Sequence, residues 1–281
     1  MGRRLASRFV AGLTVEDAMA VCRRVNSEGI AVSLDSLGES VADESEARAA
    51  ADVYHRVLDA IAAGKLDANV SLKLTQMGMD IRPELAEAIT AEVVEHAARV
   101  GSFVRIDMES SDYTEATIAM TERLHARFPG TVGTVLQAYL YRTEQDTERL
   151  LGQGIRIRLC KGAYKERAEV AFARKADVDA NYVRLMKRTA TSGVFCGIAT
   201  HDEKIVDEML RFVREKEIAR TAFEFQMLYG VRRDLQQRLA KDGYRVRVYV
   251  PFGNAWYPYF MRRLAERPAN LVFLLKNMLR R

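Results

Sequence analysis

Short runs rich in β-branched and aliphatic residues recur along the chain, and segments with the apolar period of a helix separate them. The runs predict eight strands, at residues 30–35, 70–74, 103–108, 131–137, 155–160, 194–200, 221–227 and 244–250. Two further helical stretches, within residues 3–11 and 14–27, precede the first strand. Strands that alternate with helices in one unbroken series favour parallel pairing through right-handed crossovers, and eight is the number that closes a (β/α)8 barrel. An open doubly wound sheet is the alternative, but the segment SLDSLGESV after the first strand lacks the GxGxxG turn typical of that fold.

Several of the predicted strands carry polar residues on one face only. The second strand alternates Ser71, Lys73 and Thr75 with apolar residues. The other polar positions of this kind are Arg105, Asp107 and Glu109, Arg156, Arg158 and Cys160, Glu224 and Gln226, and Arg245, Arg247 and Tyr249. Half-exposed antiparallel strands would show the same alternation, but the intervening helices argue against them. Because helices cover the outside of a barrel, we predict that the apolar set faces outward and the polar set faces inward.

Charge inside a barrel must be paired or must bind a ligand, because an unpaired buried charge is costly. The inward residues near the strand starts are expected to form a structural ion-pair network; these are Arg105, Arg156, Glu224 and Arg245. The inward residues near the strand ends lie where barrel enzymes keep their active sites; these are Lys73, Asp107, Arg158, Gln226 and Tyr249. Lys73 and Asp107 stand on neighbouring strands, so we expect each to neutralise the other.

The composition is that of an ordinary soluble globular protein: of 281 residues, 48% are hydrophobic and 29% are charged, with a net charge of +5. Basic residues are spread along the chain, which argues against nucleic acid as a partner. The three cysteines, Cys22, Cys160 and Cys196, share no metal-type spacing, so we predict a reducing cytoplasm and no metal site. No apolar run reaches the ~18 residues of a membrane span, and no signal peptide is recognisable.

Eight segments in a fixed order carry a resemblance to the proline dehydrogenase family. They are SLKLTQMG (71–78), VRIDME (104–109), VLQAYLYRT (135–143), RLCKGAY (158–164), ATHD (199–202), FEFQMLYGV (223–231), YVPFG (249–253) and YFMRRLAERPAN (259–270). The resemblance extends across residues 29–281 and is to the monofunctional bacterial type. It implies one domain over residues 1–281, with N-terminal helices in 1–28, a distorted barrel in 29–281 and the last helix over the barrel mouth. Two departures are that members often carry more helical sequence ahead of the barrel, and that Cys160 stands where an aliphatic residue is common.

The resemblance implies oxidation of L-proline to Δ1-pyrroline-5-carboxylate, the first step of proline catabolism, by hydride transfer from proline C5 to N5 of FAD. A membrane quinone is the implied electron acceptor, so we expect a cytoplasmic protein that contacts the membrane surface, and a homo-oligomer is compatible with the sequence. The implied cofactor contacts are Met108, Gln137, Arg158, Lys161, Gly162, Ala163, Thr200, His201, Gln226 and Glu266. A strand-end guanidinium such as Arg158 can stabilise negative charge on a reduced flavin, and a glycine such as Gly162 lets backbone approach a phosphate.

On the substrate side, the resemblance gives the chemistry to Asp107, Arg158 and Tyr249. The implied substrate contacts are Lys73, Tyr164, Leu228, Arg262 and Arg263. On an isolated helix the adjacent arginines would read as a solvated charged face. Above a barrel mouth, two guanidinium groups suit one planar carboxylate, and this is the role that we expect for Arg262 and Arg263.

Two other classes of function are compatible with parts of this pattern. A class I aldolase would also be a (β/α)8 barrel with an interior lysine, and Lys73 would then form a Schiff base with its substrate. A non-catalytic binding module is the second alternative, but it leaves the charged inner face of the strands unexplained.

Overall fold

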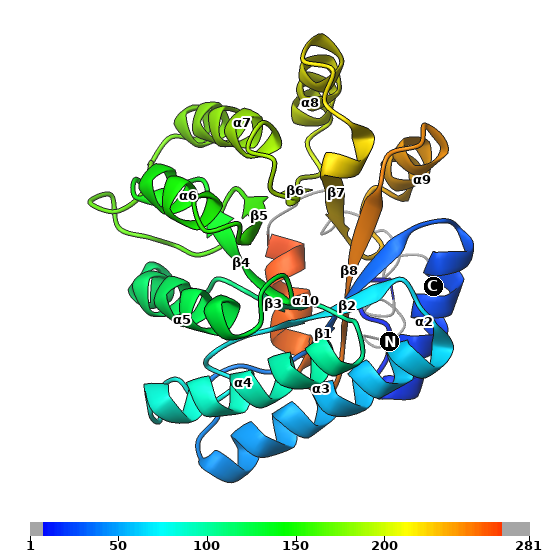
Figure 1. Cartoon of the computed structure of the whole chain (residues 1–281), viewed down its shortest axis with the longest axis vertical. Helices are drawn as coiled ribbons and strands as arrows, with labels where there is room; N and C mark the ends of the chain where they lie inside the picture. Colours follow the sequence, from blue (N-terminus) through cyan, green and yellow to red (C-terminus); the bar gives the residue numbers. More distant parts are fainter. Residues whose placement is uncertain (1–7, 266–281) are drawn as a thin grey trace, which may run out of the picture.

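The computed structural model describes residues 8–265, apart from the side chains of residue 260 and residues 262–265. Eight parallel strands close into a barrel in chain order, and β8 pairs with β1 to complete the ring (Figure 1). The strands are β1 (Ala31–Ser36), β2 (Ala68–Leu72), β3 (Val104–Ile106), β4 (Val132–Gln137), β5 (Arg156–Cys160), β6 (Cys196–Ala199), β7 (Phe223–Leu228) and β8 (Val246–Phe252). The predicted (β/α)8 barrel is confirmed, and no predicted strand end differs from the observed one by more than two residues.

Helices surround the ring of strands, and the helix predicted within residues 14–27 is confirmed as α2. The α-helices are α2 (Val15–Ser27), α3 (Glu44–Gly64), α4 (Pro83–Arg99), α5 (Thr114–Arg127), α6 (Thr143–Leu151), α7 (Lys175–Ala190), α8 (Glu203–Glu215), α9 (Arg233–Lys241) and α10 (Trp256–Ala265). Two 3-10 turns, η1 (Ser111–Tyr113) and η2 (Arg220–Ala222), precede α5 and β7. In Figure 1, α10 lies over the middle of the ring.

The helix predicted within residues 3–11 is wrong for the part that the structure describes. Residues 8–11 form a turn and an irregular segment, and residues 1–7 lie outside the described residues. The N–H of Ala11 donates to the carbonyl of Pro251 at 2.8 Å, and the N–H of Gly253 donates to the carbonyl of Gly12 at 2.9 Å. This segment is therefore bonded to the chain at the end of β8, because its backbone groups find partners there and not within a helical turn.

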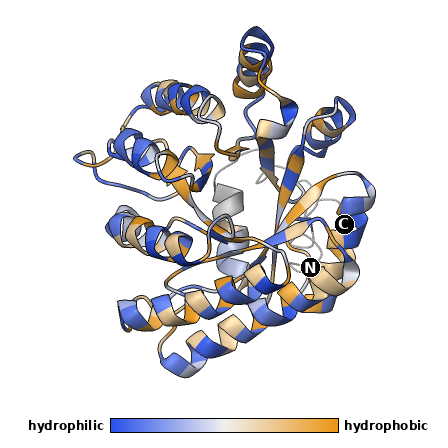
Figure 2. Cartoon of the chain, in the orientation of Figure 1, coloured by the Kyte–Doolittle hydropathy of each residue, from blue (hydrophilic) through white to orange (hydrophobic). Residues whose placement is uncertain are grey.

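The main apolar core lies between the strands and the helices. Outward residues of β1 such as Val32 and Leu34 are fully buried in it, and Figure 2 shows hydrophilic residues along the outer sides of the helices. The opposite face of the strands is polar: Arg158 on β5 donates to Ser33 on β1 and to Ser71 on β2. Only side chains inside the ring can meet in this way, so the predicted inward placement of the polar set is confirmed.

The predicted ion-pair network near the strand starts is present around one carboxylate. Glu224 is 2% exposed and accepts hydrogen bonds from Nε of Arg247 at 2.7 Å and Nε of Arg245 at 3.1 Å. Arg245 also pairs with Asp67, the half-exposed residue just before β2, at 2.7 Å. Each charge of this group has an opposite charge beside it, which is what a buried ion pair requires.

Arg105 and Arg156 do not join that network, and this part of the prediction is wrong. Their guanidinium groups stack on the ring of Phe103, 4.8 and 5.3 Å from its centroid. Nη1 of Arg105 donates to the carbonyls of Thr134 at 2.8 Å and Arg156 at 2.5 Å. A Cβ on Gly133 would lie 2.9 Å from that nitrogen and 2.2 Å from the Arg156 carbonyl oxygen. The glycine therefore leaves the space in which backbone carbonyls, and not carboxylates, solvate the buried guanidinium of Arg105.

Candidate active site

A cavity of about 640 Å³ opens at the carboxyl ends of the strands. Its size lies within the range of ligand and cofactor pockets. Every predicted site residue whose side chain is described lines this cavity: Lys73, Asp107, Met108, Gln137, Arg158, Lys161, Gly162, Ala163, Tyr164, Thr200, His201, Gln226, Leu228 and Tyr249. The barrel thus brings to one place residues that the sequence separates widely, because the ends of parallel strands meet at one rim.

Three predicted site residues fall outside this description. Arg262 and Arg263 belong to α10, but their side chains lie outside the described part of the chain, as does all of Glu266. Tyr259, one turn earlier on α10, is buried and lines the cavity. The helix that carries the two arginines therefore forms part of the cavity wall, and the roles of the arginines stay predictions.

Lys73 pairs with Asp35 and not with Asp107 as predicted. The distance from Nζ of Lys73 to Oδ1 of Asp35 is 3.0 Å, and the two residues are 9% and 1% exposed. The register alone does not decide this, because Ser71 is level with Asp35 on β1 and with Arg105 on β3, and Asp107 follows Arg105 by the same two residues as Lys73 follows Ser71. Both oxygens of Asp107 are taken by Arg158 and Tyr249, so Lys73 pairs with Asp35 on the other neighbouring strand. Burial opposes the charge on Lys73, but the nearby carboxylates, Asp35 first, outweigh it and raise the pKa of the lysine.

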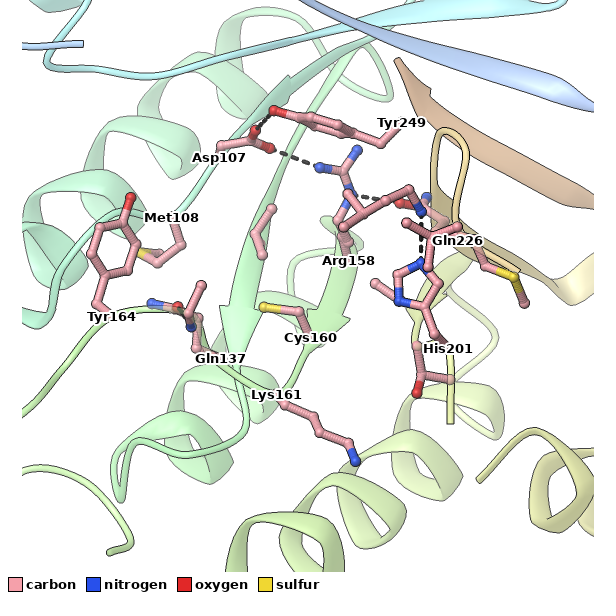
Figure 3. Close-up of a pocket in the computed structure, with 18 of the residues that line it drawn as sticks. Asp107, Met108, Gln137, Arg158, Cys160, Lys161, Tyr164, His201, Gln226 and Tyr249 are labelled. Carbon is pink, nitrogen blue, oxygen red and sulfur yellow. Dashed lines mark hydrogen bonds and ion pairs between the residues drawn. The ribbon is translucent and has the colours of Figure 1, made fainter. Parts of the chain in front are cut away.

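Arg158 from β5 stands at the centre of a hydrogen-bond network in the cavity (Figure 3). Its Nη1 donates to Oδ1 of Asp107 at 2.8 Å, its Nε donates to Oε1 of Gln226, and its Nη2 donates to Ser71 at 3.1 Å. The hydroxyl of Tyr249 donates to the other oxygen of Asp107 at 2.8 Å, and its ring centroid lies 5.2 Å from the guanidinium. Burial raises the pKa of Tyr249 well above its usual value, so the phenol stays protonated and serves as a donor. These contacts fix the orientation of the planar guanidinium.

Gln226 is oriented in turn by residues deeper in the barrel. Its Nε2 donates to Oε1 of Glu224 at 2.6 Å, which leaves its carbonyl oxygen to accept from Arg158. A Cβ on Gly197 would lie 2.4 Å from Nε2 of Gln226. The glycine on β6 therefore makes the room in which this amide can lie across the barrel.

Lys161, the first residue of the KGAY segment, is held by carboxylates from two helices. Its Nζ lies 2.5 Å from Oδ1 of Asp179 in α7 and 2.9 Å from Oδ2 of Asp202, the residue that caps α8. Asp179 also pairs with Lys175, which lines the cavity. Figure 3 shows the Lys161 side chain pointing away from Arg158. The two lysines and the two carboxylates thus form a charge-balanced group at the edge of the cavity, and its members are partly exposed.

The rest of the KGAY segment is fixed by Gln137 and Tyr139. The N–H of Ala163 donates to Oε1 of Gln137 at 3.3 Å, and Nε2 of Gln137 donates to the carbonyl of Glu109 at 2.9 Å. Gly162 has φ of 125°, and a Cβ there would lie 2.5 Å from the ring of Tyr139. Both the backbone conformation and the packing therefore require glycine at this position.

His201 stands at the start of the loop before α8 and is held by a backbone group. Its Nε2 accepts a hydrogen bond from the N–H of Leu228 at 2.9 Å (Figure 3). Since an amide N–H can only donate, Nε2 carries no proton here, and the neutral imidazole has its proton on Nδ1. Thr200 accepts a hydrogen bond from the N–H of Asp202 at 3.1 Å, which shapes the same loop. Both residues thus order the loop that borders the cavity.

Several lining residues were not assigned to the site from the sequence. They are Asp35, Val135, Cys160, Lys175, Ala199, Asp202, Met227, Val231 and Tyr259. Asp35 could have been found, because Ser33 and Asp35 alternate with Val32 and Leu34 in the same way as the polar residues of β2. The apolar residues gave no such signal, since a buried wall residue and a core residue look alike in sequence.

Cys160 lines the cavity as a neutral thiol, because burial raises the pKa of its side chain to about 12.

Among the described residues, no group of three or more histidine, cysteine or acidic side chains is placed to hold a metal ion.

Comparison with known proteins identifies relatives along the whole chain. The family model described as proline dehydrogenase matches residues 18–276. Proline dehydrogenase 1 of Bacillus subtilis (strain 168) is 43% identical over 281 residues, which is 100% of this chain and 93% of that protein. The proline dehydrogenase of Deinococcus radiodurans is 42% identical over 280 residues, covering 98% of this chain and 90% of that protein.

Solved structures show the same fold at lower sequence identity. The crystal structure of proline utilization A (PutA) from Bdellovibrio bacteriovorus, inactivated by N-propargylglycine, superimposes with a TM-score of 0.87 at 24% identity. The match covers 93% of this chain and 32% of that longer one. A PutA structure from Corynebacterium freiburgense has a TM-score of 0.82, also at 24% identity, and covers 96% of this chain and 32% of the other. The barrel described above is therefore shared with one part of these larger proteins.

Proposed function

The chain belongs to the proline dehydrogenase family, and from that premise we propose that it oxidises L-proline to Δ1-pyrroline-5-carboxylate with FAD, passing the electrons to a quinone. The observation that carries the proposal is the pair of cations at the cavity, Lys73 and Arg158. Each is held by its own carboxylate, which is buried for Lys73 and partly buried for Arg158. One cation can bind the carboxylate of an amino acid, and the other can stabilise negative charge on a reduced cofactor. The two tasks require two fixed positive groups at one site.

The donor set of the cavity fits a flavin cofactor. The guanidinium of Arg158 supplies a planar, permanently charged donor. The side-chain amides of Gln137 and Gln226 each have a hydrogen-bond donor and an acceptor. Gly162 and Ala163 bring backbone to the cavity edge without a bulky side chain, and the ammonium of Lys161 lies at the same edge, paired with Asp179 and Asp202. These are the groups that would hold the isoalloxazine ring and the phosphates, as would Met108, Thr200 and His201 in the loops around them. When bound, FAD would supply the two-electron acceptor that takes the hydride from proline C5.

The substrate would lie between Lys73 and the wall formed by Tyr164, Leu228 and Tyr249. We expect its carboxylate to bind the Lys73 ammonium and the guanidinium groups of Arg262 and Arg263. Asp107 keeps Tyr249 and Arg158 in place through its two oxygens, which supports a role in orienting the reacting groups. The ring nitrogen must be unprotonated for a C=N bond to form, and its proton would be lost to water before or during binding.

An absorption spectrum tests the proposal most directly. We expect the purified protein to be yellow, with flavin bands that bleach when L-proline is added without oxygen. A control with D-proline or with pyrrolidine separates recognition of the substrate from simple photoreduction. A protein that stays colourless and takes up no added FAD would refute the proposal.

The aldolase alternative is disfavoured by the environment of Lys73. A Schiff-base lysine must lose its proton easily, and enzymes achieve this by lowering the pKa of the lysine. Here Asp35 lies 3.0 Å from the ammonium and the pKa of Lys73 is raised. The lysine is therefore arranged to bind an anion and not to attack a carbonyl.

The encounter with a quinone, the cytoplasmic location and the extent of the domain over residues 1–281 are part of the proposal. Across the part of the chain that the structure describes, no helix is both long and apolar enough to cross a bilayer. A quinone dissolved in a membrane would then be reached from the membrane surface. Reduction of a water-soluble short-chain quinone by proline, with and without added vesicles, tests this part.

A further inference from the structure

Asp35 is a buried carboxylate that the reaction proposed above does not use. It lies on β1, is 1% exposed, and its Oδ1 accepts from Nζ of Lys73 at 3.0 Å. Burial and then the nearby charge of Asp107 raise the pKa of this carboxyl, whereas Lys73 and the hydroxyl of Tyr249 lower it. A carboxylate this deeply buried is costly unless its charge is paired, so its position beside Lys73 requires an explanation.

We propose that Asp35 is a positioning residue, whose carboxylate holds the ammonium of Lys73 at the cavity in charged form, ready for the carboxylate of the substrate. The identity of that ligand rests on the proposed function. The relation between Asp35 and Lys73 rests on geometry alone. An ammonium has three donors, and the ion pair with Asp35 uses one of them, so the others can serve an arriving carboxylate.

The other charged groups around Lys73 cannot replace Asp35, because they are engaged elsewhere. Asp107, which directly follows β3, uses one oxygen for Arg158 and the other for Tyr249 of β8. Glu109, which follows β3, accepts from the N–H of Thr75 at 3.1 Å and from its hydroxyl at 2.6 Å. Of the carboxylates that act on Lys73, Asp35 has the largest effect on its pKa, followed by Asp107 and then by Glu109. Direct contact is thus reserved for Asp35.

Replacing Asp35 by asparagine should convert Lys73 into a titrating group. Burial disfavours the charged form of a lysine, and buried lysines without a partner lose their proton near neutral pH or below. In the Asp35→Asn protein, burial would still lower the pKa of Lys73, and the carboxylate that raises this pKa most would be absent. The ammonium would then be lost as the pH rises, and carboxylate binding would weaken, because one of the three cations expected to hold the carboxylate would be gone.

The binding of tetrahydro-2-furoate as a function of pH tests this relation. This ligand keeps the ring and the carboxylate but has no amine, so its charge is constant above about pH 6. Calorimetry on the FAD-loaded full chain should give a dissociation constant that is flat from about pH 6 to 9 in the unchanged protein. In Asp35→Asn the dissociation constant should rise with pH once Lys73 begins to lose its proton, and should level off at the value of Lys73→Met.

Matched variants separate this effect from general damage to the site. Glu109→Gln removes a nearby carboxylate that does not touch Lys73, and its profile should stay flat. Asp35→Glu keeps the charge and should restore a flat profile, with weaker binding because the carboxylate is displaced by one methylene. Adding Asp35→Asn to Lys73→Met should produce no pH dependence, since the titrating group is gone.

A second measurement follows the lysine itself and requires no ligand. Carbon-13 NMR of protein labelled at the lysine Cε, with the Lys73 signal assigned by its absence in Lys73→Met, reports the charge of this side chain. The unchanged protein should keep Lys73 charged to beyond pH 10, and Asp35→Asn should bring its titration several pH units lower. Titration of Lys73 below pH 9 in the unchanged protein would overturn the proposal even if Asp35→Asn did not fold. A charged Lys73 and flat binding in a folded Asp35→Asn protein would overturn it as well.

The proposed function can fail separately from this inference. A protein that binds no flavin and no tetrahydro-2-furoate would refute the assignment of the substrate. The NMR titration would still decide whether Asp35 controls the charge of Lys73.

Discussion

The inner face of the barrel carries charge at both ends, and the two ends use it differently. Near the strand starts, Glu224 lies between Arg245 and Arg247, and Asp67 supplies a second carboxylate to both arginines. At the strand ends, Lys73 and Arg158 each have one carboxylate, and both line a cavity of about 640 Å³. The first arrangement satisfies charges, whereas the second holds them in place with donors to spare. Function is therefore expected where pairing is incomplete, and stability where it is complete.

Asp107→Ala should produce the largest loss of activity. It leaves the Nη1 of Arg158 and the hydroxyl of Tyr249 without their acceptor in a buried site. Removing one partner of a buried ion pair costs about 3–5 kcal/mol, so proline turnover should fall by several orders of magnitude. Steady-state kinetics measure the effect, and flavin content should be largely retained because Lys161 and the KGAY backbone are unchanged. Turnover close to that of the unchanged protein would contradict the role of the strand-end network.

Glu224→Gln should give the opposite pattern, with a large loss of stability and a smaller loss of turnover. The change removes the nearest carboxylate of buried Arg247 and leaves it Asp67 at 3.8 Å. Removing one partner of a buried pair costs about 3–5 kcal/mol. The cost is reduced here because Asp67 still pairs with both arginines and Arg245 is partly exposed. Denaturant unfolding of the two proteins measures this loss of unfolding free energy. Turnover should fall less, because a glutamine can still accept from Nε2 of Gln226.

The same variant has a defined pH dependence. Burial opposes the charge of Glu224, but Arg247 and then Arg245 outweigh it, so the pKa of this carboxyl is lowered in the folded protein. Its contribution to stability is therefore present above its unfolded pKa of about 4.3 and is lost as the pH falls through the folded value. The difference in unfolding free energy between the two proteins should shrink on acidification. A constant difference would show that the cost comes from packing and not from charge.

The sequence predicted the positions of the charged residues at the strand starts and strand ends better than it predicted their partners. Alternation of polar and apolar residues identified the inner face, and the rim of the barrel then brought the predicted site residues together. The ion-pair partners could not be predicted, because the register lets Lys73 meet either Asp35 on β1 or Asp107 after β3. A contact across the barrel decides between them, since Arg158 from β5 takes Asp107. Arg105 was assigned to an ion pair because a sequence cannot show that Gly133 opens a path to backbone carbonyls. The alternation in the sequence therefore predicted which face of each strand points into the barrel, whereas the contacts of each side chain depend on three-dimensional packing.

Arg262→Met and Arg263→Met should have an intermediate effect. A hydrogen bond to a charged group contributes roughly 1.5–3 kcal/mol, so loss of one guanidinium should weaken carboxylate binding by roughly 10- to 150-fold. The KM for proline should rise or kcat/KM should fall by that factor, and lysine should rescue only in part because a point charge lacks the planar fork. Pyrrolidine, which has no carboxylate, should bind equally well to all of these variants. Changes within twofold in both methionine variants would show a charged helix face with no part in the substrate site.

The smallest effect is expected for an ion pair on the outer surface, which serves as the exposed reference for the buried pairs inside the barrel. Arg123 in α5 meets Glu87 in α4 through Nε at 3.0 Å and Nη2 at 2.6 Å, a geometry as close as that of Glu224 with Arg247. The Arg123 side chain is 54% exposed, so water and salt screen the pair, and exposed pairs contribute about 0.2–1 kcal/mol. Arg123→Ala should lower the unfolding free energy by no more than this, should lose even that difference at high salt, and should leave proline turnover unchanged. A loss as large as that of Glu224→Gln would mean that short distances, and not burial inside the barrel, determine the strength of these pairs.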